Sequence, residues 1–465
     1  MTKTIAVIGA GFCGTMIACE LARASVPDGL VIALVDDRSQ FARGVAYQCN
    51  NEGWLLNARA AHLGAVSGQP GDFSRFCREI GIDPASDTFI PRAVYGAYLE
   101  DLLDRTAAST LRHRLYRVYA RAESIGAGRD GARAEIRLDN GQALRADHVV
   151  LATGAVSRQA EAKAEFKSLG ERYLHDPWNV HTLYDSPPGT LFAVLGTGLT
   201  ALDVVSSLRR HVRQARFHLV SRRGLLPLPH GGSTANVPGV DLAALLESSA
   251  RGGVTDTIRA VRRVAALYQS LGGDWRDVID RLRPAVPGIW RSWSTRQKKQ
   301  FVEHAAPYWD VHRHRCPAST NEMLQALREE GRLTIEAARL LNVRAAGEQI
   351  ELVTRRRHEH QAGVMRADYL INCTGAPSGL LQNPLLVQLR NAGLATADEF
   401  GLRVDDQYRL LDTSGEALDW LSYVGPLLKG KFWEVTAIPE LRVHVEQLIA
   451  RLSAQFSEPV AVAMA

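Results

Sequence analysis

The first apolar run of the chain leads directly into a glycine-rich turn. The β-branched run 5–8 is followed by Gly9-Ala-Gly11-Phe-Cys-Gly14 and then by an apolar, helix-compatible segment to about Leu21. A glycine turn between a buried strand and a helix lets the backbone approach a pyrophosphate, which the first N–H groups of the helix then bind. A second apolar run, 30–35, ends in Asp36-Asp37, where a carboxylate accepts hydrogen bonds from a ribose diol. The segment predicts a dinucleotide-binding unit.

The same pattern returns near the middle of the sequence. The apolar run 191–195 meets Gly196-Thr-Gly198, and Ala201 stands where a third glycine would, a replacement that such motifs tolerate. The next strand, 216–220, ends in Ser221-Arg222-Arg223 instead of two aspartates. A carboxylate repels a 2′-phosphate, whereas a hydroxyl and guanidinium groups bind one. We therefore expect NADPH at this second unit, with NADH as the alternative; the plain structural interpretation is that both arginines are solvated loop residues.

Two further apolar strands end in a related way. The strand 148–151 stops at Ala152-Thr153-Gly154, an ending typical of flavoproteins that bind two dinucleotides. There the backbone is expected to turn under the first cofactor and to leave for the second domain. The strand 369–372 stops at Thr374-Gly375, and it indicates a return of the chain to the first domain.

The remaining segments fit around these two units. Polarity alternates from about 115 to 150, as in an antiparallel hairpin or meander, and helical patterns fill most of 240–330. The predicted fold class is therefore α/β, with two Rossmann-like domains, one for FAD and one for NAD(P)H, and a helical insertion. The expected parts are an FAD-binding domain over 1–157 and 365–465, an NAD(P)H-binding domain over 185–238 and 331–364, and a helical insertion over 239–330 that lines the cleft.

Size and composition narrow the class of protein. A chain of 465 residues is too long for one hydrophobic core, so two or three domains are expected. A net charge of +5 is small for this length and does not call for nucleic acid. No apolar run is long enough to span a bilayer, and the first strand begins too early for a signal peptide, so we expect a cytoplasmic protein. The oligomeric state is not indicated.

The six cysteines exclude one class of flavoprotein. They are scattered, with no CxxC pair and no metal-ligand spacing, so no metal site is predicted. A disulfide reductase of this fold needs two neighbouring cysteines to relay electrons. Cys13 and Cys19 are expected to be small buried residues behind the first glycine loop.

Several motifs occur in one order along nearly the whole chain. They are GAGFCG, GVAY, WLLNARA, IPRAVYGAYL, VLATG, VLGTGLTALD, SRRGLLP, WDVHRHR, INCTG and GPLLKGKFWEVTAIPELR. In this order they resemble the FAD/NAD(P)-binding family that includes FAD-dependent urate hydroxylase and aspartate N-monooxygenase. They are more distantly similar to the flavin N-hydroxylases that act on ornithine or lysine. The resemblance implies an FAD monooxygenase with two Rossmann-like domains.

The motifs and the resemblance together assign candidate site residues. The resemblance places Asn57 and Arg92 near the flavin. Candidate contacts of FAD are Gly9, Gly11, Phe12, Cys13, Gly14, Asp36, Asp37, Thr153, Gly154, Gly425, Trp433, Thr436 and Ala437. Candidate contacts of NADPH are Gly196, Gly198, Thr200, Ser221, Arg222 and Arg223. Candidate catalytic residues are Asn57, Arg92, His230 and His314, of which the last three are candidate contacts of an anionic or ring-shaped substrate.

The expected reaction relies on the cofactors rather than on a protein nucleophile. NADPH reduces FAD, reduced flavin reacts with O₂ to give a C4a-hydroperoxide, and one oxygen atom passes to a small polar or anionic substrate. The protein's task is to exclude water and to position that substrate. The chain ends soon after its closing helix, whereas the resemblance implies a longer chain for the branch that N-hydroxylates amino acids, so we expect ring hydroxylation of urate rather than N-hydroxylation of an amino acid. An electron-transfer flavoprotein reductase without oxygenation is the third hypothesis.

Overall fold

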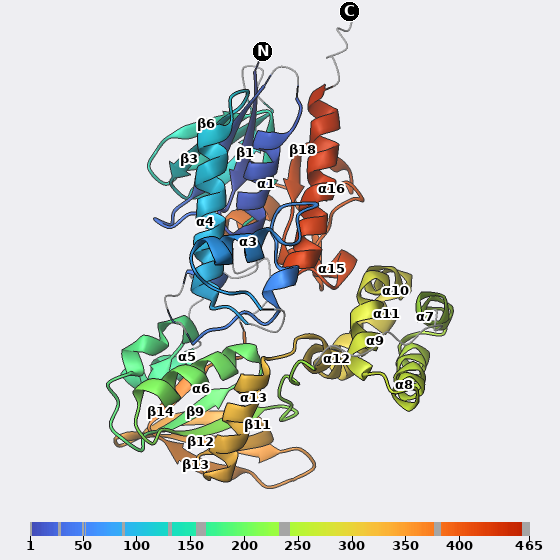
Figure 1. Cartoon of the computed structure of the whole chain (residues 1–465). Coiled ribbons are helices and arrows are strands. Elements are labelled where there is room, and N and C mark those ends of the chain that lie inside the picture. The colour runs from blue at the N-terminus through green and yellow to red at the C-terminus, as the bar shows by residue number, and fades with distance from the viewer. Residues whose placement is uncertain are drawn as a thin grey trace, which may run out of the picture. The chain divides into compact units, whose positions relative to one another are not determined.

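The chain forms two compact units, each described here by itself (Figure 1). Unit 1 comprises Met1–Asn50, Arg59–Gln159 and Pro377–Ala465, and unit 2 comprises Asn51–Ala58 and Ala160–Ala376. The computed structural model describes residues 2–26, 29–48, 51, 53–85, 89–128, 133–154, 164–231, 242–375 and 383–457.

Unit 1 is built on a six-stranded sheet in the order β17-β18-β7-β1-β2-β3. All neighbours are parallel except the edge pair β17 and β18. The central strands are buried almost throughout, which explains their uninterrupted apolar sequences. The strands are β1 (Lys3–Ile8), β2 (Leu30–Asp36), β3 (Arg114–Tyr119), β7 (His148–Leu151), β17 (Arg409–Leu411) and β18 (Ala417–Tyr423). A separate antiparallel sheet contains β4 (Ala122–Ala127), β5 (Ala134–Leu138) and β6 (Ala143–Ala146).

Three long helices pack together on this sheet, with α1 between α4 and α16 (Figure 1). The apolar face of α4 is buried, and so are its Tyr95 and Tyr98. The helices of unit 1 are α1 (Phe12–Arg23), α2 (Gly44–Tyr47), α3 (Asp72–Glu79), α4 (Arg92–Ser109), α14 (Pro384–Asn391), α15 (Lys429–Phe432) and α16 (Ile438–Ser457).

Unit 2 is built on a seven-stranded sheet in the order β13-β12-β11-β10-β9-β14-β8. Its centre is parallel, and β11, β12 and β13 form an antiparallel meander at one edge. The strands are β8 (Tyr173–Leu174), β9 (Leu191–Leu195), β10 (Arg216–Ser221), β11 (Leu333–Ala346), β12 (Gln349–Arg356), β13 (Gly363–Ala367) and β14 (Tyr369–Asn372).

A series of helices follows β10 and precedes β11 in unit 2 (Figure 1). The helices of this unit are α5 (Ala164–Lys167), α6 (Leu199–His211), α7 (Leu242–Ala250), α8 (Val254–Ser270), α9 (Trp275–Leu282), α10 (Val286–Ser292), α11 (Thr295–Gln300), α12 (Ala306–Arg313) and α13 (Ala318–Glu329), with a π-helix, η5 (Phe301–Ala305), between α11 and α12.

The centres of the two sheets are built in the same way. The Gly9 N–H donates to the last residue but one of β2, and the Gly196 N–H donates to the equivalent residue of β10, both at 2.8 Å. Asp36 in unit 1 and Ser221 in unit 2 therefore occupy equivalent positions, as their sequence contexts predicted. The two units therefore have the same backbone at this position but side chains of different chemistry.

An aspartate ties the start of the central strand in each unit. Asp147 Oδ2 accepts from the Thr4 N–H at 2.9 Å, and Asp368 Oδ2 accepts from the Leu191 N–H at 2.8 Å. The N–H of each aspartate donates back to the carbonyl of the same partner, at 2.8 and 3.0 Å. A carboxylate that accepts from a strand end fixes the register of the neighbouring strands. Because both units have the same pair of bonds, β7 and β14 are equivalent elements.

Two predictions about strands are wrong. Strand β14 belongs to unit 2, where it pairs with β9, so the chain does not return to the first domain at 365–376. Strand β3 is not part of an antiparallel meander, because it pairs in parallel with β2; only β4 to β6 form the meander. In both cases the strand was recognised from its own sequence, but its partner depends on distant residues.

Two histidines of unit 1 are buried in their neutral form. His148 is fully buried with Nε2 3.0 Å from Ser422 Oγ, and burial lowers its pKa to about 3. His444 on α16 has Nδ1 2.8 Å from the hydroxyl of Tyr408, and burial lowers its pKa to about 4. Both groups attach to the sheet through hydrogen bonds that a neutral ring can make.

Acid is therefore expected to destabilise unit 1. In the unfolded chain both rings take up a proton near pH 6.5, whereas the folded chain keeps them neutral down to about pH 4. The unfolded state thus binds more protons below about pH 6.5. For each pH unit by which the pH is lowered, the free energy of unfolding falls by up to about 1.4 kcal/mol for each histidine. Urea unfolding at pH 7, 6 and 5 measures this slope. His444→Gln should flatten it, and an unchanged slope would contradict the assignment.

Candidate functional site

The glycine loop of unit 1 leaves no room for side chains at two positions. Gly9 has φ +103°, and an added Cβ would lie 2.5 Å from the carbonyl oxygen of Ala152 at the end of β7. A Cβ on Gly14 would collide with the Gly9 carbonyl, because the helix packs directly on the turn. Helix α1 starts after Gly11, which provides no side-chain cap. The first N–H groups of α1 are therefore directed at whatever the loop binds.

Unit 2 repeats this loop. Gly196 has φ +102°, and its added Cβ would lie 2.5 Å from the carbonyl oxygen of Cys373, the residue after β14. Gly198 precedes α6 without a side-chain cap, and a Cβ there would meet nothing within 4 Å. Thr200 stands half-buried in the first turn of the same helix. The first glycine is thus required by the fold, and the second faces open space suited to a phosphate.

Asp36 already accepts four hydrogen bonds within the protein. Its Oδ2 accepts from the Ala10 N–H at 2.6 Å and from Arg38 Nη2 at 2.7 Å. Its Oδ1 accepts from the Arg38 N–H at 3.0 Å and from Arg38 Nε at 2.7 Å. A carboxylate has about four lone-pair sites, so a ribose can bind Asp36 only by displacing or sharing Arg38. The neighbouring Asp37 is exposed.

Two buried polar atoms near this loop fit a bound dinucleotide. Arg38 Nη1 and Thr153 Oγ1 are buried and have no hydrogen-bond partner among the described residues. Arg38 Nη1 lies 3.8 Å from an added Cβ on Gly44, whose own backbone packs on Gly11. Buried donors without partners are costly, and a phosphate or ribose oxygen of FAD would satisfy them. Thr153 was a predicted FAD contact, whereas Arg38 was not.

The other predicted residues of this loop serve mainly as packing. Phe12 and Cys13 are buried, and burial raises the pKa of the Cys13 thiol to about 12. Cys19 is also buried, with its pKa raised by burial to about 11. Both thiols are therefore uncharged small residues behind the loop, as predicted.

Two predicted FAD residues that are distant in sequence are joined by one tyrosine. The Tyr423 hydroxyl donates to Gly154 O at 3.3 Å and accepts from the Leu427 N–H at 3.2 Å. An added Cβ on Gly425 would lie 2.9 Å from the same hydroxyl. Tyr423 thus holds the end of β7 against the glycine loop of the C-terminal segment.

Trp433 occupies a strained turn beside this loop. It has φ +59° and ψ −60°, and the Glu434 N–H donates to Phe432 O at 2.7 Å. This is a γ-turn with positive φ, the rarer form, which costs backbone free energy. The indole is buried, and Lys429 Nζ lies 4.0 Å from its ring centroid. The exposed Thr436 and the half-buried Ala437 follow, directly before α16.

A basic pocket of about 600 Å³ lies at the end of β10 in unit 2. The register explains its composition, because Ser221 pairs with Ala337 on β11, and the next residue of β11 pairs with Arg356 on β12. Glu303 and Glu359 are the acidic residues of its lining. The arginines that line it are Arg222, Arg223, Arg339, Arg355, Arg356 and Arg357. An excess of guanidinium groups beside Ser221 favours a 2′-phosphate at this position.

Three of the four candidate catalytic residues belong to unit 2, and one of them, His230, contacts Asn57. His230 Nε2 lies 3.0 Å from the main-chain oxygen of Asn57, so this nitrogen carries the hydrogen. The main-chain N–H of His230 donates to Cys316 O at 2.9 Å, and Cys316 stands two residues after His314 in the sequence. Arg92 begins α4 in unit 1, where its positive charge opposes the rise in pKa that desolvation causes at Tyr47.

Several residues of the site were not predicted from the sequence. Arg38 stands two residues after Asp36, so the sequence places a cation beside the predicted ribose site. The run 355–357 was visible as a basic cluster, but only the pairing of β12 with β11 brings it next to Ser221. Asp147 and Asp368 stand at equivalent places in the two strand motifs, which is a repeat that a direct comparison of the segments detects.

Comparisons with known proteins agree with this construction. Residues 6–156 match a family model described as FAD-NAD(P)-binding. The ornithine N-hydroxylase of Kutzneria sp. 744 superposes with a TM-score of 0.64 at 14% identity, covering 98% of this chain and 100% of that one. The FAD-bound cadaverine monooxygenase of Erwinia amylovora gives 0.64 at 16% identity, covering 100% and 97%. The bacillithiol disulfide reductase of Staphylococcus aureus gives 0.55 at 11% identity, covering 98% of both chains.

These similarities show the fold. The predicted α/β class with two Rossmann-like units is confirmed, and the matched family model agrees with FAD and NAD(P)H as the cofactors. A search of curated proteins finds no match to this sequence. Within the described ranges, no helix has both the length and the apolar character needed to cross a membrane.

The two glycines of the unit 2 loop are expected to respond differently to alanine. Gly196→Ala places a Cβ against Cys373 at positive φ, so the free energy of unfolding should fall by about 1–3 kcal/mol. Gly198→Ala has open space and ordinary φ, so stability should be unchanged while NADPH binds more weakly. Urea unfolding and NADPH titration separate the two effects. Equal loss of stability in both variants would show that the loop is only structural.

Proposed function

We propose that this chain is an FAD-dependent, NADPH-consuming monooxygenase that hydroxylates the amino group of a small amine or amino acid. The observation that carries the two-cofactor part is the repeated loop: two glycine turns of the same construction, followed by Asp36 in one unit and by Ser221 and arginines in the other. One scaffold is thus adapted to two dinucleotides. FAD would bind unit 1, and NADPH would bind unit 2.

The residues of unit 1 fit FAD at both ends of the cofactor. The loop 9–14 would bind the pyrophosphate, and Arg38 Nη1 would donate to an oxygen of the adenosine half. Thr153, together with the loop that contains Gly425 and Trp433, would border the flavin. When bound, FAD accepts hydride from NADPH and activates O₂, and the protein positions the substrate and excludes water.

Amine hydroxylation is better supported than ring hydroxylation of urate. The similar structures include an ornithine N-hydroxylase and a cadaverine monooxygenase, and each covers nearly the whole of this chain. Both names describe the transfer of oxygen to a compound with a primary amine. The expectation of urate rested on the short C-terminal segment, which is weaker support than a match along the full length.

A disulfide reductase is less well supported. Each of the five cysteines in the described ranges is free and buried. Burial raises the pKa of Cys316 to about 11, and it raises that of Cys373 still further. Thiols that stay protonated at neutral pH do not attack disulfides, because the thiolate is the reactive form. Electron transfer to a protein partner without thiols remains an outcome that the experiments below detect.

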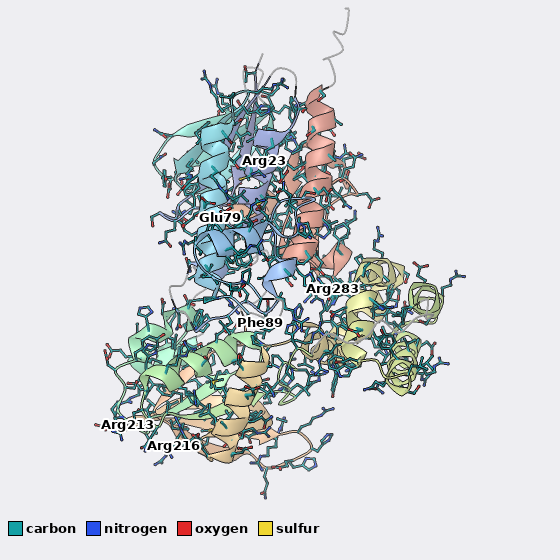
Figure 2. The ribbon with its side chains drawn as sticks, in the orientation of Figure 1. Arg23, Glu79, Phe89, Arg213, Arg216 and Arg283 are labelled. Carbon is teal, nitrogen blue, oxygen red and sulfur yellow. The ribbon has the colours of Figure 1, made fainter. Side chains whose placement is uncertain are left out.

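Arg222→Ala is expected to lower the preference for NADPH over NADH. Loss of one charge-assisted hydrogen bond to the 2′-phosphate costs about 1.5–3 kcal/mol, which is about ten- to hundredfold in the KM for NADPH. The KM for NADH should stay the same. Arg216→Ala is the matched control, because Arg216 (labelled in Figure 2) is the first residue of β10, at the opposite end of the strand from Ser221. Equal effects of both variants would contradict the assignment.

The substrate class is tested on purified, FAD-loaded protein by following NADPH oxidation and O₂ uptake. Ornithine, lysine, cadaverine and aspartate are supplied separately, with urate in parallel. The proposal expects one amine to accelerate both rates and to yield a hydroxylamine in matching amount. Urate consumption in matching amount would restore the ring-hydroxylation hypothesis. NADPH oxidation that needs a protein acceptor and consumes no O₂ would identify a reductase.

A further inference from the structure

A mostly buried carboxylate joins three neighbouring strands of unit 2 and holds one arginine of the basic pocket. Glu336 lies on β11, between β10 and β12. Its Oε1 accepts from Arg356 Nε on β12 at 2.9 Å, and its Oε2 accepts from His218 Nε2 on β10 at 3.0 Å. Thr354 Oγ1 on β12 also donates to Oε2, at 3.5 Å. Arg356 pairs with Ala338, two residues after Glu336, so the acid and the arginine are diagonal neighbours on one face of the sheet.

The Glu336 carboxylate is charged and fixed in place. Burial by itself raises its pKa, but hydrogen bonds from Arg356 and His218 outweigh burial and hold the pKa below its usual value. The Glu336 side chain is 11% exposed and that of His218 is 15% exposed, whereas that of Arg356 is 62% exposed. An ion pair between two exposed side chains contributes little, because both partners are free to move. Here the acid is held by the sheet, so the bond determines the direction of the arginine.

The bond to Glu336 leaves the outer donors of Arg356 for the pocket. A guanidinium is planar and carries five N–H donors in a rigid fork, so fixing one donor restricts the directions of the others. Glu336 binds the Nε–H, the donor nearest the aliphatic stem. Arg356 Nη1 lies 3.8 Å from Glu359, which is longer than a hydrogen bond, and both residues line the pocket. The terminal nitrogens of Arg356 are therefore the part of the group that a ligand in the pocket can bind.

We propose that Glu336 positions Arg356 for the 2′-phosphate of NADPH, so that this pair of residues contributes to the preference for NADPH over NADH. This inference rests on the proposed NADPH site in unit 2. Glu336 acts through Arg356 and is a positioning residue. An arginine that is already oriented loses less conformational freedom on binding than a mobile one, which increases affinity.

The charge of Glu336 makes the proposal easy to distinguish from simple electrostatics. A carboxylate repels a phosphate, so its negative charge alone would weaken the binding of NADPH. If charge were the main effect of Glu336, its removal would strengthen binding of a 2′-phosphate. If Glu336 positions Arg356, its removal weakens that binding. The two explanations therefore predict changes of opposite sign.

Glu336→Ala tests the proposal, with Glu359→Ala as the matched control. Both variants remove one negative charge beside Arg356, but only the first removes the bond to Nε. Calorimetry on the full-length, FAD-loaded protein compares adenosine 2′,5′-bisphosphate with 5′-AMP. We expect Glu336→Ala to bind the bisphosphate about three- to tenfold more weakly, the effect of one ordinary hydrogen bond, and to bind 5′-AMP unchanged. Glu359→Ala should bind the bisphosphate as tightly as wild type or more tightly.

Two conservative variants complete the test. Glu336→Gln keeps an oxygen that can accept from Arg356 Nε and removes the charge, so it should bind the bisphosphate at least as tightly as wild type. Arg356→Lys changes an exposed residue and is expected to fold even if Glu336→Ala does not. Lysine keeps the charge but lacks the Nε–H and the fork, so the same three- to tenfold loss is expected. Wild-type affinity in Arg356→Lys would overturn the proposal.

A double variant separates positioning from a general structural effect. If Glu336 acts through Arg356, then Glu336→Ala should not weaken bisphosphate binding further in an Arg356→Ala background. A loss that persists there, an equal loss of 5′-AMP binding, or unchanged or tighter binding of the bisphosphate by the single variant Glu336→Ala would overturn the proposal. Wild-type protein that binds both probes equally would instead overturn the NADPH site itself. Neither result depends on whether the protein oxygenates a substrate.

Discussion

In each unit a glycine packs tightly against the end of a neighbouring strand. Gly9 presses against Ala152, and Gly196 presses against Cys373, each at a distance that excludes any side chain. This contact fixes where the strand stops, where the helix starts and which way its first N–H groups point. Three features depend on this contact. They are the positions of the phosphate-binding groups, the residues after β2 and β10, and the strand ends at Thr153 and Cys373. The site is thus a consequence of backbone packing before any side chain contributes.

Much of the fold was predictable because its signals are local. The runs 5–8 and 191–195 with their glycine turns specify a strand, a turn and a helix within about twenty residues. The neighbours of a strand in its sheet could not be predicted in this way, because nothing in the sequence 369–372 itself indicates whether the strand joins the sheet of unit 1 or that of unit 2. The same limit applies to the site. Arg222 was found beside Ser221 in sequence, whereas Arg356 reaches the same pocket only through two steps of strand register.

The two units carry different side chains at one equivalent position, the end of the second strand. In unit 1 the last residue of β2, Asp36, is a carboxylate whose lone pairs are filled by Arg38 and the Ala10 N–H. In unit 2 the equivalent Ser221 accepts from the Gly224 N–H and from Thr197 Oγ1, both at 2.9 Å, and the arginine-lined pocket begins at the next residue. A neutral, filled position suits a cofactor without a 2′-phosphate. A strongly positive position suits one that carries it.

The γ-turn at Trp433 has a consequence for how the C-terminal segment keeps its conformation. A backbone in this conformation stores about 1–3 kcal/mol, held by the burial of the indole and by Lys429 over its ring. Because burial of the indole and the Lys429 contact must together outweigh this cost, loss of either contact is expected to let the turn relax to an ordinary backbone conformation. The conformation of this turn thus depends on side-chain packing rather than on the preference of the local backbone.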